Sequence, residues 1–281
     1  MQTVRDLEGL RDAVASFRAD GATIALVPTM GALHAGHMAL IEAARRPGTK
    51  VIASIFVNPK QFGPNEDLAR YPRREAADTR LLADHGCDLL WAPTVEVMYP
   101  EGFATNISVG GVSEGFDGAA RPGHFDGVAT VVTKLFNQTG ADVAYFGEKD
   151  FQQLAVIRRF VADLDLPIEI VGVPTQRDDD GLALSSRNIY LDEEQRAKAT
   201  ALPRALGVAA RSIARGDDPE DAMAEARAAL VAAGFEVDYV ALADAETLAE
   251  SPAADRPRRL LAAARMGATR LIDNVAVEAT P

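Results

Sequence analysis

The sequence predicts an α/β protein, with a doubly wound parallel sheet first and a smaller C-terminal α+β domain after it. Short apolar runs alternate with helical patterns over about residues 23–173, which is typical of parallel strands joined by crossover helices. From about residue 175 the order changes to alanine-rich helices and then three strands, which indicates an antiparallel sheet. With 281 residues, 48% of them hydrophobic, the chain has enough apolar material for a large core.

The elements of the first part follow in order along the chain. We expect a helix at residues 126–138 because its apolar side chains recur on one helical face, which outweighs their β-branched propensity. Pro72 is expected to interrupt an otherwise helical stretch at residues 67–86. The expected strands are residues 23–28, 51–57, 88–91, 143–146 and 168–173, and the other expected helices are residues 36–46 and 150–163.

The second part begins at a predicted domain boundary, which separates residues 1–175 from residues 176–281. Its expected helices are residues 192–215 and 219–233, and its expected strands are residues 236–241, 259–264 and 269–277. Within the first part, residues 109–123 form a long glycine-rich connection. Such a connection can be a lid or binding loop, or a plain surface excursion.

Charge and cysteine content exclude several classes of function. A formal net charge of -12 makes the chain a poor general binder of phosphate backbones, so we expect no nucleic-acid partner. The sequence has no run of about 18 apolar residues, and its charged start lacks the apolar region of a signal peptide, so we expect no membrane association. The one cysteine, Cys87, excludes an intramolecular disulfide and fits a reducing cytoplasm.

The segment VPTMGALHAGH, residues 27–37, follows the first long apolar strand and leads into a helix. In a doubly wound sheet this junction lies at the carboxyl edge, where backbone N–H groups and the helix dipole favour an anion. Gly31 and Gly36 have no side chains, so a nucleotide can approach the main chain. His34 and His37 are three residues apart and can donate hydrogen bonds to phosphate oxygens. Alternatively, they only cap the helix.

Three further motifs place polar side chains after predicted strands or beside the domain boundary. GEKD, residues 147–150, offers a lysine charge for a phosphate, or an aspartate that caps the next helix. LALSSRN, residues 182–188, offers two hydroxyls and an arginine fork for pyrophosphate, or is only a polar turn. In SIFVNPKQF, residues 54–62, the amides of Asn58 and Gln61 suit hydroxyls and a carboxylate, or only form a turn.

Together these segments resemble the pantothenate synthetase family, the pantoate–β-alanine ligases of coenzyme A biosynthesis. The matching stretches occur in the family's order and cover much of residues 23–191. They are PTMGALHAGH, SIFVNPKQF, ARPGHFDGV, FGEKDFQQL and GLALSSRNIYL, and RLIDNVAVE near the end is also similar. The HxGH motif by itself indicates only the wider nucleotidyltransferase superfamily, whereas the full set is specific.

The resemblance implies ATP-dependent condensation of (R)-pantoate with β-alanine, giving pantothenate, AMP and pyrophosphate through a pantoyl adenylate. It also implies a homodimer whose Rossmann-like N-terminal domain binds ATP and pantoate. The smaller C-terminal domain is expected to close over the site. Mg²⁺ is expected to accompany ATP as co-substrate, and the protein ligands of the metal are left unassigned.

The resemblance also implies roles for residues by position, with His37 as the catalytic histidine. It implies ATP binding by Met30, Gly31, Ala32, Leu33, His34, Ala35, Gly36, His37, Gly147, Glu148, Lys149, Asp150, Gln176, Leu184, Ser185, Ser186 and Arg187. Gln61 and Gln153 are implied for pantoate, and Gln61 also for β-alanine. Near the site, with roles less defined, are Asn58, Tyr71, Arg121 and His124.

The first step needs no general base in this hypothesis, because a carboxylate is already ionised at neutral pH. Catalysis then comes from positioning and from stabilisation of phosphate charge by His34, His37, Lys149 and Arg187, with residues 109–123 and 178–187 as candidate lids. The alternatives are another nucleotidyltransferase, a tRNA synthetase and a non-catalytic nucleotide-binding regulator. The acidic chain argues against the synthetase, and the presence of all four charged or imidazole groups argues against the regulator.

Overall fold

The computed structural model describes residues 1–64, 66–250 and 252–278, which divide into two compact units. Unit 1 contains Met1–Gly110, Arg121–Glu148 and Val156–Pro174. Unit 2 contains Gly111–Ala120, Lys149–Ala155 and the chain from Thr175 onward. Two short segments from the first part of the chain therefore belong to unit 2.

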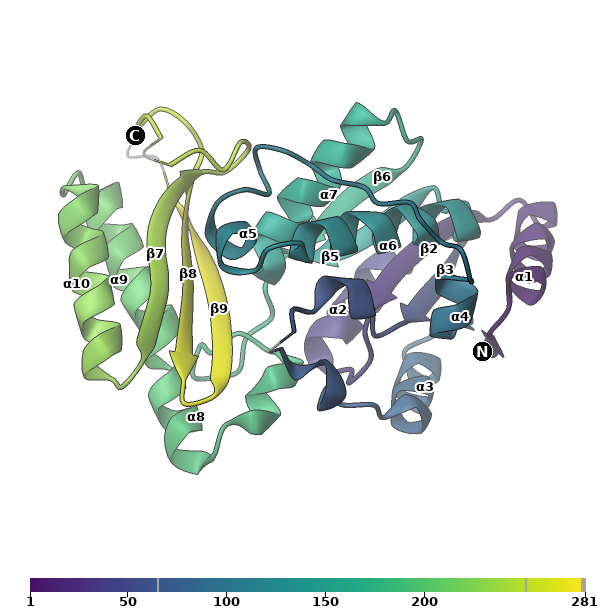
Figure 1. Cartoon of the computed structure of the whole chain (residues 1–281), viewed down its shortest axis with the longest axis horizontal. Helices are drawn as coiled ribbons and strands as arrows, with labels where there is room; N and C mark the ends of the chain where they lie inside the picture. The colour runs from purple at the N-terminus through teal and green to yellow at the C-terminus, as the bar shows by residue number, and fades with distance from the viewer. Residues whose placement is uncertain (65, 251, 279–281) are drawn as a thin grey trace. The chain divides into compact units, whose positions relative to one another are not determined.

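A six-stranded parallel sheet is the scaffold of unit 1 (Figure 1). Its strands lie in the order β1-β4-β3-β2-β5-β6, and every neighbouring pair is parallel. From β2 the chain adds strands first on one side, through β3 to β4, and then on the other side, through β5 to β6. The bounds are β1 Gln2–Val4, β2 Thr23–Thr29, β3 Thr49–Ile55, β4 Leu89–Trp91, β5 Val143–Gly147 and β6 Glu169–Val173.

Helices cover both faces of this sheet, which explains why its strands read as continuous apolar runs. On one face, α2 and α3 pack Ile41 and Leu82 into a buried cluster with Val27 of β2. Successive side chains of a strand alternate between faces, so Leu26 is fully buried on the other side, where α1 and α6 contact β2. The helices are α1 Leu7–Ala19, α2 Ala35–Ala44, α3 Glu75–Asp84, α4 Val95–Met98 and α6 His124–Thr139. Helix α7, Phe151–Asp163, begins in unit 2 and ends in unit 1.

Unit 2 contains an antiparallel sheet in the order β7-β8-β9. Helices α9 and α10 pack against this sheet, and Leu206, Leu230 and Leu260 belong to the cluster that they bury. The bounds are α5 Phe116–Ala120, α8 Glu193–Ala199, α9 Ala201–Ala214, α10 Pro219–Ala232, β7 Glu236–Asp244, β8 Arg258–Met266 and β9 Thr269–Val277. The predicted α/β class and the order of the long elements are confirmed.

Several predicted bounds differ from the structure. The helix predicted over residues 192–215 is divided into α8 and α9. Pro203 lies in the first turn of α9 and has no N–H to continue the ladder from α8, while the Thr200 hydroxyl donates to the Ala197 carbonyl at the junction. Residues 109–123 are not wholly irregular, because they contain α5. Strand β1 and helix α1 have no counterpart in the prediction.

Candidate active site

Two of the polar motifs follow the strands between which the sheet reverses its direction of growth. Residues 30–37 follow β2, and GEKD ends β5 and continues beyond it. The two strands pair in parallel, with Ala25 opposite Val143, so their carboxyl ends lie side by side. In open α/β sheets ligands bind at this point of reversal. The fold therefore places the starts of both motifs where a ligand is expected.

Asp78 holds the loop between β2 and α2 in place. Gly31 has a φ of +84° and Ala32 a φ of +51°, so the chain passes through the left-handed region twice. The Asp78 carboxylate, 3% exposed, accepts hydrogen bonds from the N–H groups of Ala32 and Leu33, at 2.9 Å each. A Cβ on Gly31 would lie 3.1 Å from Oδ2 of Asp78. Asp78 is thus a residue whose importance the local sequence does not reveal.

His34 and His37 cap the N-terminus of α2 reciprocally. Nδ1 of His34 accepts from the Gly36 N–H at 3.1 Å, and Nδ1 of His37 lies 3.3 Å from the His34 backbone nitrogen, whose N–H it accepts. The two ring centroids are 4.1 Å apart. Because each Nδ1 is an acceptor, each neutral ring carries its proton on Nε2. Capping and donation to an anion use different nitrogens, so the two interpretations drawn from the sequence are compatible.

Asn58 and Gln61 form a polar pair beyond the end of β3, where Asn58 caps the short 3-10 turn η1, Pro59–Gln61. The Asn58 side chain donates from Nδ2 to Oε1 of Gln61 at 2.9 Å and accepts the Tyr99 hydroxyl at 2.8 Å. Nε2 of Gln61 lies 3.2 Å from the sulfur of Met30 in the loop after β2. The turn therefore brings Gln61 beside the first motif, as a buried group next to the carboxyl edge of the sheet.

The motif ARPGHFDGV supports the same turn from the start of α6. Arg121 forms a bidentate ion pair with Glu66, at 2.6 and 2.7 Å, and its Nη1 lies 2.9 Å from Nε2 of His124. Nδ1 of His124 lies 2.8 Å from the main-chain carbonyl oxygen of Gln61. Burial by itself raises the pKa of Glu66, but the hydrogen bonds and charge of Arg121 outweigh it and hold that pKa below its usual range.

Lys149 and Asp150 belong to unit 2, in the 3-10 turn η3, Glu148–Asp150, that precedes α7. The main-chain carbonyl of Lys149 accepts a hydrogen bond from Nδ2 of Asn274 in β9, at 2.9 Å. The strand RLIDNVAVE, which the resemblance includes, therefore fixes the backbone that carries Lys149.

Gln152 anchors part of residues 109–123, one of the two candidate lids, within unit 2. Its Nε2 donates to the carbonyls of Val112 and Gly115, at 3.0 and 2.8 Å, and its Oε1 accepts the Asp117 N–H at 3.0 Å. The side chain of Gln152 is buried and committed to these contacts, whereas Gln153 is half-buried.

The Asp117 side chain adds a second anchor for the same segment. Its Oδ1 accepts from the Tyr239 hydroxyl at 3.0 Å and from Nη2 of Arg270 at 2.6 Å. Burial raises the pKa of the Tyr239 phenol, and the neighbouring Asp117 charge raises it further, so this hydroxyl remains a donor. Residues 111–120 are therefore built into unit 2 by side chains of its sheet.

The other predicted ATP contacts in unit 2 lie on a short hairpin and a 3-10 turn. Leu184 donates its N–H to the Gln176 carbonyl at 2.9 Å, beside a bridge between Arg177 and Ala183. The Ser185 hydroxyl accepts the Arg187 N–H at 3.2 Å and caps the turn η4, Ser186–Tyr190. The segment thus contains a hydrogen-bonded hairpin and a capped 3-10 turn, and it carries hydroxyls and a guanidinium within a few residues.

Two aspartates beside this hairpin form ion pairs with a helix of unit 2. Arg196 donates to the carboxylates of Asp178 and Asp180, at 2.8 and 2.7 Å. These ion pairs link the hairpin to α8.

Within residues 1–64, 66–250 and 252–278, no group of three or more His, Cys, Asp or Glu side chains is arranged to hold a metal ion. Among the described helices, none combines the length and the apolar character needed to cross a bilayer. Cys87 is buried, and burial raises the pKa of its thiol to about 11.

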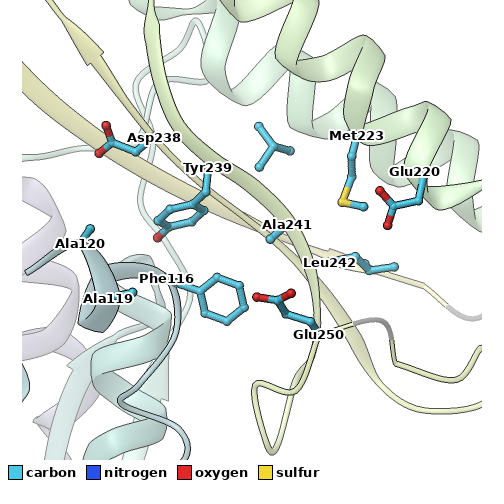
Figure 2. Close-up of a pocket in the computed structure, with 11 residues that line it drawn as sticks. Phe116, Ala119, Ala120, Glu220, Met223, Asp238, Tyr239, Ala241, Leu242 and Glu250 are labelled. Atoms are coloured by element: carbon cyan, nitrogen blue, oxygen red, sulfur yellow. The ribbon is translucent and has the colours of Figure 1, made fainter.

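A further cavity of about 450 Å³ lies within unit 2, between α5, β7 and α10 (Figure 2). The rings of Phe116 and Tyr239 lie on one side of it and the Met223 side chain on another. Its lining contains none of the site residues predicted from the sequence.

The family model described as Pantoate-beta-alanine ligase matches residues 2–276 of the chain. A pantothenate synthetase from Rhizorhabdus wittichii is 67% identical over 100% of both chains. The crystal structure of pantothenate synthetase from Thermus thermophilus is 49% identical, covers 100% of both chains and has a TM-score of 0.92. A pantoate-beta-alanine ligase from Francisella tularensis, solved in complex with beta-gamma ATP and beta-alanine, is 33% identical with a TM-score of 0.82 and covers 98% of this chain and 97% of its own.

Proposed function

This chain belongs to the pantoate-beta-alanine ligase family, and we propose that it uses ATP to join (R)-pantoate to β-alanine, giving pantothenate, AMP and pyrophosphate. The similar Francisella protein carries the ATP analogue and β-alanine named with its structure, which supports the same substrates here. The observation that carries the proposal is the meeting of two motifs at the sheet edge, where Nε2 of Gln61 lies 3.2 Å from the sulfur of Met30.

The proposed first step forms a pantoyl adenylate. A carboxylate oxygen of pantoate attacks the α-phosphorus of ATP, and the bond from that phosphorus to the bridging β-phosphate oxygen breaks, so pyrophosphate leaves. No proton has to be removed, since the carboxylate is already ionised at neutral pH. The Nε2 donors of His34 and His37 are suited to stabilise the charge that moves onto phosphate oxygens.

The second step transfers the acyl group. The amine of β-alanine attacks the acyl carbon, the bond from that carbon to the AMP oxygen breaks, and the amine releases a proton. His37 is the candidate to take this proton, given its position in the first motif, and to do so at Nδ1 it would have to give up the hydrogen bond from the His34 N–H. Exclusion of water from the mixed anhydride would protect it from hydrolysis.

The proposed contacts to ATP are the residues that the family resemblance implies. They are Met30, Gly31, Ala32, Leu33, His34, Ala35, Gly36, His37, Gly147, Glu148, Lys149, Asp150, Gln176, Leu184, Ser185, Ser186 and Arg187. Lys149 and Arg187 would supply positive charge for the phosphates. Gln61 and Gln153 are the proposed pantoate ligands, and Gln61 also serves β-alanine. We assign the C-terminal domain, from residue 176, the role of closing over the site.

Mg²⁺ enters this proposal bound to ATP, as part of the substrate. Magnesium keeps several waters and is bound largely through substrate phosphates in such enzymes. Asp78 holds the loop after β2, since each of its oxygens accepts a backbone N–H group, and the protein ligands of the metal stay unassigned.

We further propose that the chain acts as a homodimer in the cytoplasm. The dimer follows from the family resemblance, and the single, buried thiol of Cys87 is consistent with a reducing compartment. Sedimentation equilibrium of the purified protein would test the dimer, and a monomer across the working concentrations would contradict it.

The decisive experiment mixes the purified protein with ATP, Mg²⁺, pantoate and β-alanine. We expect equimolar AMP and pantothenate, and none when pantoate is omitted. Without β-alanine, labelled pyrophosphate should exchange into ATP only when pantoate is present. Release of ADP, or exchange that does not depend on pantoate, would contradict the adenylate mechanism and favour another transferase.

A further inference from the structure

The turn that carries Gln61 rests directly on the first turn of α6. A Cβ on Gly127 would lie 2.3 Å from the carbonyl oxygen of Lys60 and 2.7 Å from Cα of Gln61, so the two backbones touch. Nδ2 of Asn58 also donates to the Gly127 carbonyl at 3.1 Å. His124 stands three residues before Gly127 and therefore lies on the same face of the helix, toward this turn.

The hydrogen bonds of His124 determine which ring nitrogen carries its proton. A guanidinium has donors and no acceptor, so Nη1 of Arg121, 2.9 Å away, must donate to Nε2 of His124. Nε2 is then unprotonated, and the proton of the neutral ring resides on Nδ1. From there it is donated to the Gln61 main-chain carbonyl at 2.8 Å. This assignment follows from the hydrogen-bond network.

Arg121 keeps this arrangement in place without adding an uncompensated charge. Its guanidinium is paired with both oxygens of Glu66, and it also reaches the Gln61 carbonyl from Nη2 at 3.4 Å. A bidentate arginine–carboxylate pair has a defined geometry as well as a favourable energy. The imidazole of His124, 8% exposed, thus lies between the Arg121 guanidinium, which donates to it, and the Gln61 peptide carbonyl, which accepts from it.

We propose that His124 is a positioning residue for pantoate recognition. Its Nδ1–H holds the main-chain carbonyl of Gln61, and this hydrogen bond orients the peptide from which the Gln61 side chain projects. The side chain is then presented to the hydroxyl and carboxylate groups of a small hydroxy acid. The inference rests on the proposed function, in which Gln61 binds pantoate, and His124 itself need not touch any substrate.

Two substitutions separate this role from simple packing. In His124→Asn the side-chain amide nitrogen takes approximately the position of Nδ1 and can still donate to the Gln61 carbonyl. In His124→Gln the amide reaches toward the position of Nε2, where it meets Arg121 and not the Gln61 carbonyl. Both residues are polar, and their comparison remains informative if His124→Ala does not fold.

We expect His124→Gln and His124→Ala to raise the KM for pantoate about tenfold, the effect of losing one good hydrogen bond, with kcat changed less than about threefold. His124→Asn should restore the KM for pantoate to within about threefold of wild type, and the KM for ATP should not change in any variant. Combining His124→Ala with Gln61→Ala should add little to Gln61→Ala alone, because both act on one contact. Urea unfolding of each variant checks its fold.

His85 provides the matched control, since its Nδ1 also lies 2.8 Å from a carbonyl oxygen, that of Leu81. His85→Asn and His85→Gln should leave every KM unchanged. Equal KM values for the Asn and Gln variants of His124, or additive effects in the double variant, would overturn the inference. If Gln61→Ala raises the KM for pantoate while the His124 variants do not, only the positioning role is wrong. If wild type makes no pantothenate, the proposed function itself is wrong.

Discussion

At the scale of single residues, the polar side chains of the candidate site differ in how many of their atoms hold the backbone. His34 and His37 cap α2 through Nδ1, so a neutral ring in either position has its proton on Nε2. Asp78 contributes in the opposite way, because both of its oxygens hold the loop after β2. Substitutions at these positions therefore separate effects on rate from effects on folding.

His37→Ala should reduce the pantoate-dependent exchange of pyrophosphate into ATP by at least about 100-fold, because a donor to the developing phosphate charge is lost. The broken cap should cost only about 0.5–2 kcal/mol of folding free energy. Exchange kinetics and circular dichroism measure the two effects. The control, His85→Ala, should keep the wild-type rate. A near-normal rate in His37→Ala would refute its catalytic role.

Asp78→Asn should lower the free energy of unfolding by about 1–3 kcal/mol, because the new amide group points a donor at a backbone N–H. Urea unfolding measures this change. Asp84→Asn provides the control on the same helix, since Asp84 is exposed, and should shift stability by less than about 0.5 kcal/mol. Equal stabilities of the two variants would show that the loop is held by other contacts.

At the scale of elements, the close approach of α6 to the turn η1 places the polar pair of Asn58 and Gln61. Gly127 permits this approach because it has no side chain, and the Lys60 carbonyl occupies the space where a Cβ would be. The geometry of the turn is thus decided by a helix that begins more than sixty residues later in the chain.

Gly127→Ala should destabilise the protein by about 1–3 kcal/mol and raise the KM for pantoate, because α6 and η1 must move apart. Gly207→Ala is the matched control in another helix, where the nearest atom to a new Cβ is the end of the flexible Arg211 side chain at 3.4 Å. For Gly207→Ala we expect the free energy of unfolding to rise by about 0.5–1 kcal/mol, because alanine lowers the backbone entropy of the unfolded chain. Thermal unfolding and steady-state kinetics distinguish the two glycine variants. A Gly127→Ala variant more stable than wild type would contradict the close contact between α6 and η1.

At the scale of the whole molecule, several carboxylates join distant parts of the chain and are held ionised by those contacts. Asp142 accepts from Arg18 of α1 at 2.6 and 2.9 Å and from the Ile24 N–H at 2.7 Å. Burial raises the pKa of Asp142, but these hydrogen bonds outweigh it and hold the pKa below its usual range. In unit 2 the Arg256 guanidinium beside Asp244 has the same effect on the pKa of that carboxyl.

The free energy of unfolding should therefore decrease as the pH is lowered. A carboxyl whose pKa is lower in the folded state stabilises the protein above the unfolded pKa, about 4, and this stabilisation is lost as pH falls through the folded value. The urea midpoint should decrease as the pH is lowered from about 5 to 3. Asp142→Asn should show a weaker dependence on pH. In the control Asp217→Asn, where the side chain is exposed and lies 3.6 Å from Arg215, the dependence should match wild type. Equal pH dependence in wild type and Asp142→Asn would contradict the argument.

Local patterns predicted most of the long elements. The strands β2, β3 and β5 read as buried apolar runs because both faces of a covered parallel sheet exclude water. Helix α1 has no counterpart in the prediction, although Asp6, a residue type that favours helix N-termini, caps it by accepting the Gly9 N–H at 2.8 Å. The division of residues 192–215 into two helices also had a local cause in Pro203.

By itself, the sequence determined the fold class, the four polar motifs and the family resemblance, because hydrophobic period and residue type are local properties. Only the tertiary structure decided how side chains distant in the chain support those motifs: Asp78 under the first loop, His124 against the Gln61 peptide, and Gln152 on residues 112–117. The physical reason is that a backbone hydrogen bond can be satisfied by any suitably placed side chain, so its partner depends on how the chain packs and not on sequence spacing.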